Sequence, residues 1–189
     1  MALIAPSRRY DGVAQLLHWL TALLVIAAWS LGEFDDVLPN GAGRAAGLFA
    51  HISVGLAILA MVSVRVPWQM AYRPLHETAK AGTWVTAWTG LVARIAHYAM
   101  YMLLAAVPIT GIVLQFARGN AVPLFGFGAI SSPWAMDRAF ANNAKEVHEF
   151  AANALVILAL IHALAALLHH FVLRDRTLLR MLPRSPEEQ

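Results

Sequence analysis

The sequence of 189 residues contains no cysteine and few charged residues. Without cysteine there can be no disulfide, no covalently attached c-type haem and no cysteine-ligated iron–sulfur cluster. Charged residues make up 13% of the chain and apolar residues 59%, with a mean hydropathy of +0.59, a balance typical of a membrane protein. The net charge of +3 does not indicate a nucleic-acid partner, because the basic residues flank apolar runs, where membrane topology accounts for them.

Four apolar runs are each long enough to cross a bilayer, which takes about 20 helical residues at a rise of about 1.5 Å each. We expect spans at about 13–33, 47–68 and 91–117, and a fourth from about 145 to near Phe171, with Asp11 as N-cap of the first. This pattern predicts an all-α, integral membrane four-helix bundle in one domain, 1–189. Segment 69–90 is predicted to be a polar loop, segment 118–143 to cap one end of the bundle, and the basic tail to lie at the membrane surface.

The fourth span carries two histidines, His148 and His162, that are fourteen residues apart. At about 100° per residue, fourteen steps return to within about 40° of the starting direction and advance about 21 Å along the helix. Both imidazoles therefore leave one face. Ionisable residues inside membrane helices are costly and usually functional, so two in register predict one ligand for each of two stacked metal centres.

The distribution of basic residues orients the spans. Ten lie on the side of the two termini and four on the other side, so the positive-inside rule predicts that both termini are cytoplasmic. The ten are Arg8, Arg9, Arg65, Arg73, Lys80, Arg94, Arg174, Arg176, Arg180 and Arg184, and the four are Arg44, Arg118, Arg138 and Lys145.

This orientation places four histidines in two pairs of equal depth. His18 of the first span lies at the cytoplasmic depth of His162, and His51 of the second lies at the outer depth of His148. Each pair can hold a low-spin haem b from both sides, leaving iron no open position, so such haems transfer electrons and do not bind oxygen. Zinc suits the pattern less, because structural zinc sites need four ligands in one place. Histidines with isolated structural roles are a weaker alternative still, because such residues would not need to lie at matching depths.

Other candidate residues leave alternatives open. Gly55, one turn after His51, removes bulk either for a flat macrocycle or for close helix packing. His97 of the third span is expected to be a non-ligand that hydrogen-bonds a propionate, lines a quinone site or bonds a neighbouring helix. His169 is either a proton relay at the cytoplasmic rim or a solvated histidine at a helix C-terminus. His76 is expected to be a solvated loop residue.

Six segments spread over nearly the whole chain carry a resemblance to a known family: RYDGVAQLLHW, HISVG, AHYAMYMLLAAVPITG, FARGN, KEVHE and HALAALLHHFVLRDRTLLRMLP. These segments resemble the bacterial cytochrome b561 proteins, small four-helix dihaem quinone oxidoreductases of the inner membrane. The haem ligands of that family fall on His18, His51, His148 and His162 of this chain. The resemblance thus implies the same four ligands that the depth argument predicts.

Within the family, the chain is most similar to members of the superoxide:ubiquinone oxidoreductase type, which take electrons from periplasmic superoxide. The resemblance implies two haem b groups, with superoxide and ubiquinone as substrates. Although the sequence has no distinctive quinone motif, we expect the quinone near the cytoplasmic haem. Arg118, Arg138 and Lys145 could then guide the anion, or they could be ordinary interfacial anchors. The outer segments carry four basic and six acidic residues, so only a local basic funnel would serve. The alternative function is a membrane anchor and electron conduit for a partner dehydrogenase or hydrogenase.

Overall fold

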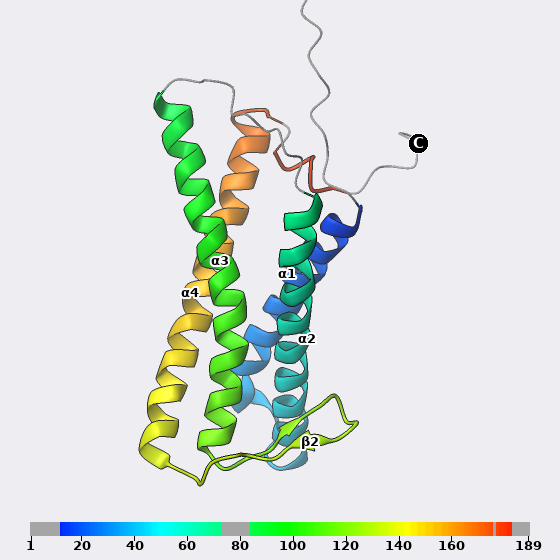
Figure 1. The fold of residues 1–189 in the computed structure, drawn as a ribbon, viewed down its shortest axis with the longest axis vertical. Coiled ribbons are helices and arrows are strands. Elements are labelled where there is room, and N and C mark those ends of the chain that lie inside the picture. Colours follow the sequence, from blue (N-terminus) through cyan, green and yellow to red (C-terminus); the bar gives the residue numbers. More distant parts are fainter. Residues whose placement is uncertain (1–11, 73–83, 176, 183–189) are drawn as a thin grey trace, which may run out of the picture.

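Four long helices dominate the computed structural model, which describes residues 12–72, 84–175 and 177–182 (Figure 1). Within these described residues all four are long and apolar enough to cross a membrane, which confirms the predicted all-α membrane bundle. The helices are α1 (Gly12–Glu33), α2 (Ala42–Tyr72), α3 (Trp84–Ala117) and α4 (Arg138–Phe171), with a 3-10 helix η1 (Asp35–Val37) before α2. Between α3 and α4, strands β1 (Val122–Pro123) and β2 (Ala129–Ile130) pair antiparallel.

Three helices are longer than the apolar runs predict. Residues 69–72 continue α2 and residues 84–90 begin α3, so much of the predicted loop 69–90 is helical. Helix α4 starts at Arg138, where the Asp137 carboxylate caps it by accepting the Phe140 N–H at 3.0 Å. The end of an apolar run marks the edge of the hydrocarbon layer, whereas helical hydrogen bonding continues until a cap or breaker ends it. The predicted N-cap Asp11 and the predicted loop residue His76 lie outside the described residues.

The bundle pairs α1 with α2 and α3 with α4, and α2 also packs along α3, whereas α1 approaches α4 much less. A buried apolar cluster joins the helices at mid-height and consists of Ile58, Val62, Leu104 and Leu155. Because Leu155 is seven residues from both His148 and His162, this cluster forms an apolar layer between the two histidine levels. Many large apolar side chains face outward along the helices, as a lipid-facing surface requires.

The two ends of the bundle differ. At one end, which we call the hairpin end, β1 packs against α2 and α3, so the predicted cap over the bundle is confirmed (Figure 1). At the other, the terminal end, residues 177–182 form turns near the start of α1. Gln15 Nε2 donates to the Arg180 carbonyl at 3.1 Å and Trp19 Nε1 to the Met181 carbonyl at 2.9 Å. The start of α1 and the C-terminal segment therefore lie together.

Candidate functional site

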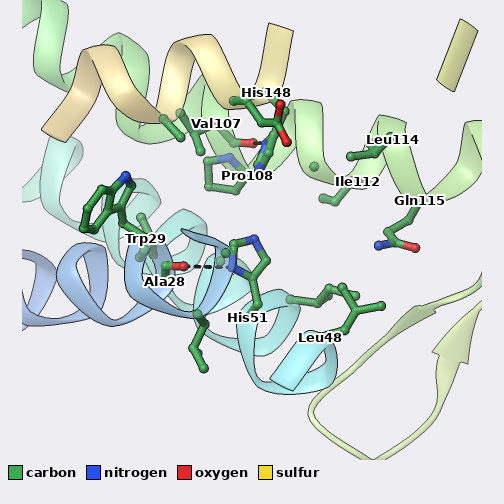
Figure 2. A pocket seen from close by; sticks show the side chains of 18 of the residues that line it. Ala28, Trp29, Leu48, His51, Val107, Pro108, Ile112, Leu114, Gln115 and His148 are labelled. Atoms are coloured by element: carbon green, nitrogen blue, oxygen red, sulfur yellow. Dashed lines mark hydrogen bonds between the residues drawn. The ribbon is translucent and has the colours of Figure 1, made fainter. Parts of the chain in front are cut away.

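His51 of α2 and His148 of α4 face each other near the hairpin end, with ring centroids 6.1 Å apart (Figure 2). They line a cavity of about 710 Å³ that receives residues from all four helices. A cavity of this size falls in the range of about 300–1,000 Å³ that small-molecule and cofactor sites occupy. The structure thus brings the predicted outer pair together across an open space.

Backbone carbonyls orient both of these imidazoles. His51 Nδ1 lies 2.8 Å from the Ala28 carbonyl of α1, and His148 Nδ1 lies 3.0 Å from the Val107 carbonyl of α3 (Figure 2). Since a carbonyl only accepts hydrogen bonds, each Nδ1 carries the proton and donates it. In a neutral ring this leaves the Nε2 lone pair available to a metal, which is the arrangement that metal-ligating histidines usually adopt.

Glycines leave room for these rings. A Cβ on Gly32 would lie 3.1 Å from His51 Cε1, and a Cβ on Gly111 would lie 3.1 Å from His148 Cε1. A Cβ on Gly55 would meet nothing within 4 Å, and Gly55 lines the cavity. Of the two alternatives for Gly55, the structure therefore favours open space over close helix packing. The sequence does not reveal this role of Gly32, because a glycine near the end of a helix is common as a helix terminator.

The predicted inner pair also meets. His18 of α1 and His162 of α4 have ring centroids 6.4 Å apart near the terminal end. His97 of α3 lies closer to His162, at 5.1 Å between centroids, while its Nδ1 donates to the Ala93 carbonyl of its own helix at 2.6 Å. His97 is thus a third histidine at the level of His18 and His162.

Arg65 of α2 is a residue of this site that sequence reasoning missed. Its side chain is only 8% exposed, and its Nη2 donates to His18 Nδ1 at 3.0 Å. Its guanidinium carbon also lies 5.3 Å from the centre of the Tyr101 ring, within cation–π range. From the sequence alone Arg65 is only one of the basic residues that orient the spans, because the direction of its side chain depends on how α2 is rotated.

Both ring separations fit two imidazoles on opposite sides of one metal ion. A metal–nitrogen bond of about 2 Å on each side, plus about 1.1 Å from nitrogen to ring centre, gives about 6.2 Å between centroids. The pairs at 6.1 and 6.4 Å match this value, and the His97–His162 separation of 5.1 Å does not. In the part of the chain that the structure describes, no three His, Cys, Asp or Glu side chains gather to hold one metal ion, so a four-ligand zinc site finds no support.

Charged residues of both signs line the cavity at the hairpin end. Arg118 and Lys145 are among them and Arg138 is not, whereas Arg44 joins them unpredicted. Lys145 pairs with Glu149 at 3.2 Å, and Arg44 donates to the carbonyls of Asp35 and Asp36. The acidic residues of the lining are Glu33, Asp35 and Glu149. Three basic and three acidic residues therefore line the cavity. Because Lys145 pairs with Glu149 and Arg44 bonds backbone carbonyls, a basic funnel would have to centre on Arg118.

His169, at the end of α4, forms an ion pair with Asp175 through its Nδ1. Partial burial raises the pKa of Asp175, but hydrogen bonds from His169 and Thr177 outweigh it and hold this pKa at about 2. Both side chains are 40% exposed. His169 therefore ties the chain beyond α4 to the helix end.

Four membrane-spanning helices that present two facing histidine pairs define a membrane cytochrome b architecture. The chain belongs to the prokaryotic cytochrome b561 family, whose model matches residues 9–184. It is 35% identical to the probable superoxide oxidase CybB of Yersinia pestis over 94% of this chain and 97% of that protein. It is 30% identical to cytochrome b561 homolog 2 of Escherichia coli K12 over 100% of this chain and 98% of that protein. It is 32% identical to cytochrome b562 of Cereibacter sphaeroides over 92% of this chain and 94% of that protein.

Family membership defines the class of function. The chain is a multi-pass bacterial membrane protein of electron transfer, and the family implies haem b as its cofactor. The cavity, the ring separations and the carbonyl-bound Nδ1 atoms at the hairpin end fit a bis-histidine haem.

Proposed function

We propose that this chain is a dihaem superoxide:ubiquinone oxidoreductase of the bacterial inner membrane, with both termini in the cytoplasm. His51 and His148 would hold the outer haem b, and His18 and His162 the inner one. The observation that carries the proposal is the pair of histidine levels on α4, each facing a second histidine at the separation that one metal ion requires. When bound, haem b supplies reversible one-electron redox chemistry without an open coordination position.

The chain's own residues set the conditions for electron transfer. The two histidine levels are about 21 Å apart along α4, because fourteen residues rise by about 1.5 Å each. The apolar cluster of Ile58, Val62, Leu104 and Leu155 lies between them, and Ile58, Leu104 and Leu155 also line the inner part of the cavity. An apolar layer of this kind suits electron exchange between two fixed centres.

The two proposed substrates react at opposite ends of the bundle. At the hairpin end, two superoxide ions lose one electron each and leave as two molecules of dioxygen. At the terminal end, one ubiquinone takes up the two electrons and two cytoplasmic protons and becomes ubiquinol. Support for superoxide comes from the 35% identity to a probable superoxide oxidase. His97, which is exposed and adjacent to His162, is the proposed contact for the quinone.

The steering of superoxide is proposed to depend on Arg118. Arg118 lines the cavity, while Lys145 is paired with Glu149 and Arg138 lies outside the lining. A single cation near the entry raises the local concentration of a small anion, and added salt screens the effect. Arg118→Gln should therefore slow haem reduction by superoxide several-fold at low ionic strength, whereas Arg138→Gln should change it little.

Stopped-flow absorbance tests the proposed function. Oxidised, purified protein is mixed with superoxide, and the reduced haem b bands are followed with and without ubiquinone. We expect fast reduction that superoxide dismutase abolishes, followed by reoxidation only when quinone is present. Bands that stay oxidised in a sample with two haems per chain would reject superoxide as the substrate and leave the haem assignment intact.

A second function, electron conduit for a partner dehydrogenase or hydrogenase, is favoured by one observation. The turn between β1 and β2 carries two aromatic side chains, Phe125 and Phe127, that are 50% and 96% exposed at the hairpin end. Exposed aromatic residues are frequent anchors of protein interfaces. A mild-detergent pull-down that recovers a stoichiometric redox enzyme with the wild type, and loses it with Phe127→Ser, would support this function.

A further inference from the structure

Arg65 is a buried cation without an acidic partner in the part of the chain that the structure describes. Its Nε has no hydrogen-bond partner, and its Nη2 bonds only the neutral acceptor of His18. Of the described acids, only Asp175 lies toward the terminal end, and it bonds His169 and Thr177. A buried charge is costly unless it is paired, so this guanidinium lacks the anion that its position calls for.

The hydrogen bond to His18 sets the wrong tautomer for metal binding. Arginine has only donors, so His18 Nδ1 accepts and the neutral ring carries its proton on Nε2. In the outer pair, by contrast, both Nδ1 atoms donate to carbonyls and leave Nε2 unprotonated. Ligation by His18 through Nε2 therefore requires Arg65 to leave Nδ1. A displaced, buried guanidinium then needs another acceptor within reach of its side chain.

We propose that Arg65 binds a propionate carboxylate of the haem held by His18 and His162, and that haem binding moves its guanidinium from His18 to that propionate. This inference rests on the proposed function. Haem b brings two carboxylates into a site where the described residues offer none, and a guanidinium binds a carboxylate through two parallel hydrogen bonds. While it bonds His18, the guanidinium also lies over the Tyr101 ring. Arg65 would thereby favour the binding of a macrocycle that carries carboxylates over one that carries none.

Removing the charge should lower the reduction potential of one haem. A nearby cation disfavours the ferric form, which carries one more positive charge than the ferrous form, and Arg65→Gln also leaves the propionate uncompensated. We expect the equilibrium constant for reducing one haem to fall about tenfold, which for a one-electron couple is about 59 mV. The propionate bending band of that haem in resonance Raman spectra should shift as well. Arg65→Lys, which keeps the charge, should stay near the wild-type potential.

Arg94→Gln is the matched control. Arg94 of α3 lies toward the same end of the bundle, is exposed and bonds the Gly90 carbonyl of its own helix at 3.3 Å. This variant removes the same charge and should leave both potentials and both Raman bands unchanged. All variants are purified as holoprotein, and circular dichroism and gel filtration verify the fold.

The outcomes separate this inference from the proposed function. Unchanged potentials and Raman bands in Arg65→Gln would overturn the role of Arg65 and leave the dihaem assignment standing. If Arg65→Gln loses one haem, retention of that haem by Arg65→Lys supports the charge pairing, and its loss from a folded Arg65→Lys overturns it. A His162→Ala variant that keeps two haems would refute the proposed ligand set itself.

Discussion

Gly111 of α3 is the residue that leaves room for the His148 imidazole. A methyl group there would lie 3.1 Å from His148 Cε1, so the ring would have to shift by a few tenths of an ångström from its bond to Val107. We expect Gly111→Ala to speed haem loss from the outer site several-fold. Alanine favours a helix by about 1 kcal/mol over glycine, so a weaker α3 would not be the cause.

The measurement is thermal bleaching of the Soret band together with the haem-to-protein ratio. Gly90→Ala, on the same helix, is the control, because a Cβ there meets nothing within 4 Å. Equal haem loss from the two variants would contradict the steric role of Gly111.

His162 and His97 offer a direct test of the inner pair. His18 and His162 have the separation that one iron needs, whereas His97 is too close to His162 to ligate the opposite side. We expect His162→Ala and His18→Ala to hold one haem per chain instead of two, and His97→Ala to hold two. The pyridine haemochrome assay gives the number. A one-haem His97→Ala with a two-haem His18→Ala would assign the inner ligand to His97.

At the scale of elements, the His169–Asp175 pair fastens the C-terminal segment to α4. The pKa of Asp175 falls from 3.8 to about 2 on folding, so the pair stabilises the folded chain above about pH 4. This contribution is lost as the pH falls through about 2, when the folded carboxylate takes up its proton. We expect Asp175→Asn to melt below the wild type at pH 5, by an amount that vanishes near pH 2.

Circular dichroism melting curves at a series of pH values measure this difference, and Glu146→Gln serves as an exposed-acid control. Because both side chains are 40% exposed, solvent screens the pair and the difference in melting temperature should be small. A gap between Asp175→Asn and the wild type that stays constant down to pH 2 would contradict the role of the carboxylate.

The sequence predicts the helices better than it predicts their ends and rotations. The lengths of the apolar runs predict four spans. The spacing of the histidines along the helices, together with the orientation given by the basic residues, predicts the depths at which His18 meets His162 and His51 meets His148. Those inferences need only the rise per residue and the thickness of a bilayer. The start of α4 depends instead on local capping by Asp137. The inward direction of Arg65 depends on packing of α2 against α1 and α3, which no local pattern records.

At the scale of the whole molecule, the apolar layer between the histidine levels divides the bundle into two chemically different halves. The hairpin end has an open cavity lined by Arg118 and other charged residues, and its imidazoles are already set for metal binding. The terminal end has a buried Arg65, a third histidine and a C-terminal segment tied to Gln15 and Trp19. This asymmetry suits a path with an anion at one end and a proton-requiring acceptor at the other.

Because the chain has no cysteine, single cysteines can report its orientation without background. Phe127→Cys places a thiol on the hairpin end at a side chain that is 96% exposed, and Ser185→Cys places one on the tail beyond the C-terminal segment. The positive-inside rule predicts that the tail is cytoplasmic. A membrane-impermeant maleimide should therefore label Phe127→Cys in intact spheroplasts and label Ser185→Cys only after the membrane is permeabilised. The wild type is the blank, and the reverse pattern would put the open cavity in the cytoplasm, where periplasmic superoxide could not reach it.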